Sequence, residues 1–261
     1  MSGKIVLKKV EKPIRYILGV LLFLAVVFAI GFKIYTLNYY KADDEAIAEI
    51  KQEIGDRVST YSDKNLVVFV PNNEEAKAII VFYPGGKVEY TAYSGLMYEL
   101  ADRGYACLLP RMPENLAFLR LNAVDIIKDK YPDRIKGAEG LKWYLAGHSL
   151  GGVAASQYLG EHADGSYAGI ILCASFTTTD FSSSDLKLLS IYGSEDKVLN
   201  MDSYNESKSK WPDDAQEYVI KGGIHSYFGN YGIQNGDGIP SITNTEQIVD
   251  AADVITGFIG E

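Results

Sequence analysis

The sequence GHSLG at residues 147–151, followed by Gly152, constrains the fold more than any other feature of the chain. An apolar run, WYLAG (143–147), leads into it, and a helical pattern begins at Leu150. A sharp turn from a strand into a helix has no room for a side chain two positions before or after the serine, so both positions require glycine. The pattern predicts a strand-to-helix turn that exposes the hydroxyl of Ser149 above the edge of a sheet.

Short apolar runs and helical spacings alternate along the rest of the chain, an order typical of an α/β fold with a mostly parallel sheet flanked by helices. Runs such as AIIVFY and GIILCA suit strands that are buried on both faces. Only 12 residues separate the runs ending at Ala174 and starting at Lys187, too few for a large cap domain. Strands are expected at 57–62, 66–70, 78–83, 105–110, 143–147, 167–174, 187–193 and 216–220, and helices at 90–103, 121–130, from 150, near 203 and at 245–259.

Near the N-terminus, 17 consecutive uncharged and mostly apolar residues run from Tyr16 to Phe32, and Lys33 can extend its amine toward water. A helix over 14–37 would then exceed the ~20 residues that span a bilayer. A cleaved signal peptide and a buried core helix are the alternatives, but GFKIYTLNYYK follows the run and offers no site of small residues for cleavage. We expect an uncleaved transmembrane anchor over 14–37.

Charge predicts which side of the membrane each part occupies. Residues 1–33 contain six Lys or Arg and one Glu, and most of these charges precede the apolar run. This predicts that residues 1–13 are cytoplasmic and that the globular domain lies on the outer side of the membrane. Residues 34–261 carry a net charge of −14, which repels nucleic acid. We expect a linker helix over 38–55 and a globular domain over 56–261.

A serine hydroxyl needs a base to act as a nucleophile, and histidine is the usual one. The chain has three histidines. His148 lies inside the predicted turn and His162 at the far end of the following helix, whereas His225 follows the last predicted strand directly. Position and elimination therefore favour His225 as the base for Ser149.

An acidic residue is needed to orient the imidazole, and it should lie between the serine and the histidine in the sequence. Asp196 fits best, because it follows the strand predicted at 187–193, and sites on open α/β sheets lie at the carboxyl ends of strands. Glu195, Asp180 and Asp185 are the competing carboxylates, and Asp196 could also be only a turn residue.

Backbone N–H groups must stabilise the oxyanion of an acyl-transfer reaction. Leu150 would supply one, and the PGGK sequence after the strand at 78–83 would supply the other from Gly86 or Lys87, unless that sequence is only a turn. No metal or other cofactor is expected; the loop at 236–238 is read as a turn, and Cys107 and Cys173 as core thiols. The expected walls of a shallow pocket are Tyr83, Tyr90, Phe118, Phe176 and Tyr227.

The residues at 78–96, 105–119, 144–151, 191–198 and 218–235 together resemble the small bacterial α/β hydrolases grouped near the dienelactone hydrolases. The resemblance covers about residues 60–260. It implies an α/β-hydrolase fold and a catalytic triad of Ser149, Asp196 and His225. Dienelactone hydrolases generally use a cysteine nucleophile, so their substrate does not follow from the resemblance.

Together these features predict a membrane-anchored serine hydrolase, a carboxylesterase or thioesterase acting on a small-molecule acyl ester or thioester. An acyltransferase or peptidase using the same triad is the alternative within catalysis. A surface module that binds a ligand without turning it over is the alternative outside it.

Overall fold

The computed structural model describes residues 12–131 and 137–260, and the chain forms two compact units, Met1–Asn38 and Tyr39–Glu261. The first unit contains the helix α1 (Lys12–Leu37), whose apolar side chains are exposed along its length. By length and composition, Pro13–Leu37 could cross a membrane, although a signal sequence has the same properties.

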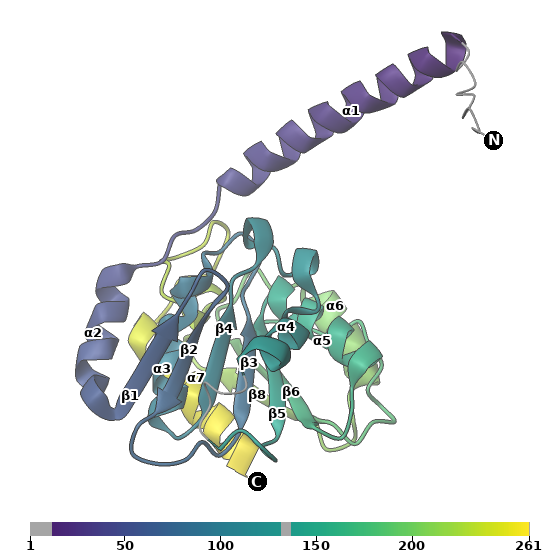
Figure 1. Ribbon diagram of the computed structural model, residues 1–261. Coiled ribbons are helices and arrows are strands. Elements are labelled where there is room, and N and C mark those ends of the chain that lie inside the picture. The colour runs from purple at the N-terminus through teal and green to yellow at the C-terminus, as the bar shows by residue number, and fades with distance from the viewer. Residues whose placement is uncertain (1–11, 132–136, 261) are drawn as a thin grey trace, which may run out of the picture. The chain divides into compact units, whose positions relative to one another are not determined.

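An eight-stranded sheet forms the centre of the second unit, in the order β1-β2-β4-β3-β5-β6-β7-β8 (Figure 1). The pairs β1–β2 and β2–β4 are antiparallel, and all the other pairs are parallel, which confirms the expected fold class. The strands are β1 (Val58–Ser62), β2 (Leu66–Pro71), β3 (Ile79–Tyr83), β4 (Ala106–Pro110), β5 (Trp143–His148), β6 (Tyr167–Cys173), β7 (Lys187–Gly193) and β8 (Gln216–Ile220).

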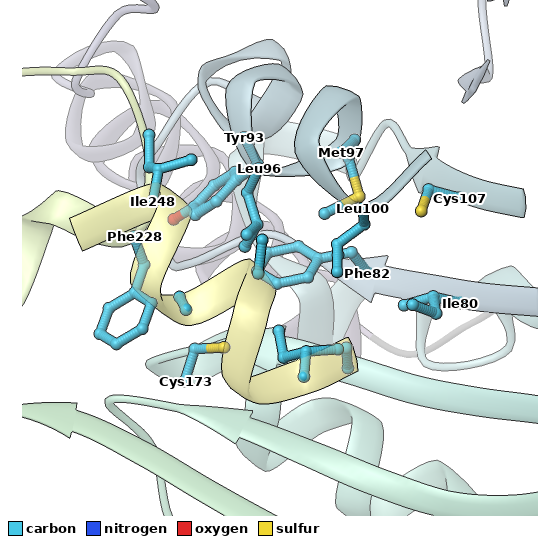
Figure 2. Packing of buried hydrophobic residues seen from close by; sticks show 14 of the residues in the cluster. Ile80, Phe82, Tyr93, Leu96, Met97, Leu100, Cys107, Cys173, Phe228 and Ile248 are labelled. Atoms are coloured by element: carbon cyan, nitrogen blue, oxygen red, sulfur yellow. The ribbon is translucent and has the colours of Figure 1, made fainter. Parts of the chain in front are cut away.

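Two hydrophobic clusters, one on each face of the sheet, hold this unit together. In β3 alternate side chains point to opposite faces, so Ile80 and Phe82 join one cluster while Val81 joins the other. Figure 2 shows the first cluster, in which β3 meets the helices α3 and α7. The helices of the unit are α2 (Asp44–Ile54), α3 (Ser94–Asp102), α4 (Ala123–Lys130), α5 (Leu150–His162), α6 (Met201–Ser207) and α7 (Asn244–Gly260).

The helix expected as a linker belongs to the globular unit instead. Asp43 caps α2 by accepting a hydrogen bond from the Ala46 N–H over 3.1 Å. Ile50 and Ile54, one turn apart, are buried in the first cluster, and α2 packs against α3. The compact unit begins at Tyr39 and not at residue 56, and the apolar face of α2 packs against α3 within it.

The connection between β6 and β7, residues 174–186, contains no helix. This confirms that no large cap domain is inserted there. Cys107 on β4 and Cys173 on β6 are free, fully buried thiols, and burial raises the pKa of both. Two other strands lie between β4 and β6, which keeps these sulfurs on separate parts of the core (Figure 2).

Candidate active site

Ser149 lies at the carboxyl end of β5, in the turn that leads into α5. Its backbone has φ 51° and ψ −123°, a conformation that residues other than glycine adopt only with backbone strain. A Cβ added at Gly147 would lie 2.5 Å from the Gly151 carbonyl carbon, and one at Gly151 would overlap the carbonyl oxygen of Tyr83. Glycine is therefore required at both positions that the spacing predicted, at Gly147 by the turn itself and at Gly151 by the carbonyl oxygen at the end of β3.

Asp196 and His225 are brought together from loops after β7 and β8. Asp196 Oδ2 lies 2.8 Å from His225 Nδ1, and the two side chains are only 1% and 2% exposed. The other oxygen of Asp196 accepts hydrogen bonds from the N–H groups of Val198 and Leu199, each over 2.8 Å. The carboxylate is thus held by its own loop and aimed at the imidazole.

The competing carboxylates are occupied elsewhere. Glu195 accepts a hydrogen bond from Ser194, and Asp180, which is exposed, accepts two from Ser182. Asp185 is also exposed. Of the four acidic residues that the sequence offered, Asp196 is the one bonded to His225.

The other imidazole nitrogen, His225 Nε2, is buried and has no hydrogen-bond partner among the described residues. A buried polar atom without a partner costs free energy, so it marks a place where a group is bound during function or where a neighbouring side chain rotates to meet it. Ser149, at the end of β5, is partly exposed, and β6 and β7 lie between its strand and the strand β8 that precedes His225.

The loop that carries His225 is held by Asp237, which sequence reasoning had treated only as part of a turn. Asp237 Oδ1 accepts from the His225 N–H over 3.1 Å and from the Gly238 N–H over 2.8 Å. Its Oδ2 accepts from the N–H and hydroxyl of Ser226, over 2.8 and 2.7 Å. One carboxylate thus satisfies four donors and fixes the backbone of the loop.

A second group of hydrogen bonds joins His225 to the loop after β3. His148 Nε2 lies 3.0 Å from the His225 carbonyl oxygen, which can only accept, so Nε2 carries the hydrogen. His148 Nδ1 then accepts from the Tyr93 hydroxyl over 2.8 Å, and Tyr93 accepts from the Gly85 N–H over 3.0 Å. Burial, and secondarily the nearby His225, lowers the pKa of His148 well below its usual value, so His148 is neutral.

The backbone N–H groups near Ser149 differ in their availability. The Leu150 N–H is the first of α5 and has no acceptor within that helix. The Lys87 N–H donates to the Asn115 carbonyl oxygen over 2.8 Å, whereas no described residue accepts from the Gly86 N–H. Lys87, one of the two expected donors of the second loop, is therefore excluded, and Gly86 remains.

Tyr83 was expected to line the pocket, and this prediction is wrong. Its side chain is fully buried on the face of the sheet that α4 and α5 cover, and its hydroxyl donates to the Leu121 carbonyl oxygen over 2.6 Å. A strand with all five residues buried gives no sign in the sequence of which side chains point to which face.

The other expected wall residues remain at least partly exposed, each in a segment that follows a strand's carboxyl end. Phe118 is 39% exposed. Phe176 lines a cavity of about 580 Å³ together with polar residues of α6. The segments are the short helices at Tyr90–Tyr93, Ala117–Arg120 and Ser226–Phe228, which contain Tyr90, Phe118 and Tyr227, and the β6–β7 connection, which contains Phe176.

An α/β sheet with a strained serine between a strand and a helix, and an acid–histidine pair on later strand ends, defines a class of hydrolases. The chain belongs to the alpha/beta hydrolase family, whose sequence model matches residues 79–249, from β3 into α7. The expected family is thereby confirmed.

Solved structures with a similar fold are numerous. One is the protein TT1662 from Thermus thermophilus, which has a TM-score of 0.56 and 16% sequence identity over 78% of this chain and 97% of that chain. At this identity the likeness concerns the fold alone. No curated protein matches the chain.

Proposed function

We propose that this protein is a serine hydrolase that cleaves acyl esters or thioesters through an acyl-enzyme on Ser149. The observation that carries the proposal is the pairing of Asp196 with His225, which also contacts His148, the residue before the strained Ser149. His225 Nε2 has no other partner in the described chain, so it is available to the serine hydroxyl. In structures without substrate such catalytic hydrogen bonds are often long and tighten on binding.

In the first half of the reaction His225 Nε2 takes the hydroxyl proton of Ser149 while Oγ bonds to the acyl carbon. The tetrahedral intermediate then collapses: the bond to the leaving oxygen or sulfur breaks, and Nε2 donates its proton to the leaving group. Asp196 holds Nδ1–H in place and stabilises the charged imidazole. In the second half, water gives a proton to Nε2 while its oxygen bonds to the acyl carbon. The bond between the acyl carbon and Ser149 Oγ then breaks, Nε2 returns the proton to Oγ, and the acid leaves.

The negative oxygen of the intermediate would be held by the N–H groups of Leu150 and Gly86. Leu150 begins α5, so the positive end of that helix also faces the developing charge. The Gly86 N–H is the unoccupied donor of the loop after β3. Its neighbour Gly85 is fixed through Tyr93, which keeps the loop in place without using the donor itself.

Two points support anchoring at a membrane. Pro13–Leu37 is long and apolar enough to span a bilayer, and the lysines at positions 4, 8 and 9 precede it. The N-terminus would then be cytoplasmic and the hydrolase unit extracytoplasmic. Alkaline phosphatase fused to the C-terminus should be active when the fusion is made in a bacterium, whereas an inactive fusion would place the unit inside the cell.

The catalytic proposal is tested with the full chain purified in detergent. A fluorophosphonate should label Ser149, and the protein should release p-nitrophenol from short acyl esters. Ser149→Ala should abolish labelling, and His225→Ala should reduce turnover by about 10³-fold or more. His162→Ala is the matched control, because His162 lies at the end of α5 and should leave turnover unchanged. An unlabelled wild-type protein would reject the proposal.

A further inference from the structure

Exposed hydrophobic side chains are unevenly distributed over the second unit. Eight large ones are exposed among its described residues. Two of them, Tyr218 and Val219, lie within the edge strand β8. The other six follow the carboxyl ends of strands, on the edge of the sheet that carries Ser149 and His225, and we call them the apolar rim. They are Phe118, Leu119, Leu150, Met201, Ile233 and Ile239.

Hydrogen bonds through Tyr40 connect two of the segments that form the apolar rim. The Tyr40 N–H donates to the Lys87 carbonyl oxygen over 2.8 Å, and the Lys87 N–H donates to Asn115, just before Phe118 and Leu119. The Tyr40 hydroxyl accepts from the Asn235 N–H over 3.0 Å, and Asn235 lies between Ile233 and Ile239. The first residues of the unit are thus built into the edge that holds the candidate site.

Those first residues also follow directly from the apolar helix. Leu37 ends α1, and Tyr40 already pairs with Val88 at the site edge. Because consecutive Cα atoms are about 3.8 Å apart, the chain allows at most about 11 Å between Leu37 and Tyr40. If Pro13–Leu37 spans a bilayer, chain length alone keeps Tyr40, a residue of this edge, within about 11 Å of the end of the spanning helix.

We infer that the apolar rim docks on the surface of the bilayer that holds α1, and that the substrate is an amphiphilic acyl ester taken from that surface. This inference rests on the proposed function and adds the substrate class to it. Exposed hydrophobic residues gathered on one edge of a domain mark an interaction surface, and the short link from Tyr40 to the apolar helix makes the bilayer the occupant that we infer. Residues 34–261 carry a net charge of −14, so the docking is apolar and does not depend on anionic lipid.

Docking is tested first without reference to activity. The full chain is reconstituted in phosphatidylcholine vesicles and recovered by flotation. Cys107 and Cys173 are fully buried, so a cysteine introduced on the surface can be labelled selectively with an environment-sensitive fluorophore. Ile239→Cys carries the label on the rim, and Val219→Cys is the matched control on an exposed strand away from it. Spin-labelled lipid should quench the label at position 239 and leave the label at position 219 unquenched.

The second test separates surface substrates from soluble ones. The triple variant Leu119→Ser, Ile233→Ser and Ile239→Ser changes exposed rim residues outside the catalytic machinery. Its kcat/KM on soluble p-nitrophenyl acetate should match that of the wild type. Its rate on a long-chain acyl ester embedded in the vesicles should fall about tenfold or more, because the serines no longer provide the apolar side chains that hold the rim in the lipid. Val219→Ser should change neither rate.

Each result decides the inference. Equal quenching at positions 219 and 239, no quenching at either, or failure of the chain to float with the vesicles overturns it, as does an equal loss on both substrates. Fluorophosphonate labelling of Ser149 in the same vesicles reports on the proposed function separately. A labelled enzyme whose rim stays out of the lipid would keep the hydrolase and reject the docking.

Discussion

His148 Nε2 donates a hydrogen bond to the carbonyl oxygen of His225, over 3.0 Å and 77 residues of sequence. The residue next to the candidate nucleophile therefore holds the loop of the candidate base. Through Tyr93, the same imidazole also holds the Gly85 N–H in the loop that offers the Gly86 donor. Three segments of the proposed site are fixed to one another by a single neutral histidine.

Tyr93→Phe should lower kcat by about tenfold with little change in KM, because it removes the acceptor of the Gly85 N–H and frees the loop after β3. The free energy of unfolding should fall by about 1–3 kcal/mol, the cost of leaving buried polar groups unpaired. Initial-rate kinetics and urea unfolding measure both effects. Tyr98→Phe, a buried tyrosine of the neighbouring helix α3, is the control. An unchanged kcat in Tyr93→Phe would show that the loop is held without it.

The pKa of His148 is lowered in the folded protein, so its protonation favours unfolding. Its contribution to stability is complete above about pH 6.5, the usual pKa of an unfolded histidine, and is lost as the pH falls below it. We expect the free energy of unfolding to decrease below about pH 6.5 by up to about 1.4 kcal/mol per pH unit from this residue. Urea unfolding between pH 7 and 5 should show a smaller slope for His148→Gln, and identical slopes would contradict the assignment of a neutral His148.

Asp237→Ala should destabilise the fold by about 2–4 kcal/mol and reduce turnover, because four donors around His225 lose their acceptor. Fluorophosphonate labelling should slow in parallel with turnover, since a misplaced base activates Ser149 less well. Asp213→Ala removes an exposed carboxylate and should leave both unchanged. Normal labelling in Asp237→Ala would mean that the loop keeps its shape without the carboxylate.

Asp196→Asn should lower kcat by about 10³-fold or more, because an amide can donate to His225 Nδ1 and favours the wrong tautomer for accepting a proton at Nε2. The fold should remain intact, since the amide oxygen can still accept the loop N–H groups of Val198 and Leu199. Ester turnover and circular dichroism measure these two properties. Glu195→Gln, the neighbouring carboxylate, should be nearly silent, and a larger loss there than in Asp196→Asn would reverse the proposed assignment.

The parts of the site that the sequence predicted are those fixed by local geometry. Gly147 identifies the turn because a Cβ there would clash within five residues, whereas Gly151 is required by the approach of the Tyr83 carbonyl oxygen from β3. The alternation of apolar runs predicted the strands, and in parallel strands the carboxyl ends lie together, so Asp196 and His225 could be expected on one edge. Position also singled out Asp196, and in the structure it is the carboxylate bonded to His225.

The parts that sequence reasoning missed depend on contacts between distant segments. Tyr93 and His148 are 55 residues apart, and nothing in the pattern around either one indicates the bond. Asp237 was read as a turn residue because three of its four donors belong to His225 and Ser226, which only folding brings near. Lys87 looked equivalent to Gly86 until the position of Asn115 showed that its N–H is occupied.

The short connection between β6 and β7 carries no helix that could form a lid over the site. If the proposed function is correct, that connection does not have to open before substrate enters. Substrate selection would then depend on location, because the molecules that reach Ser149 are those found where this edge of the sheet is held. The short link between Leu37 and Tyr40 would then determine which substrates are hydrolysed as much as the shape of the pocket does.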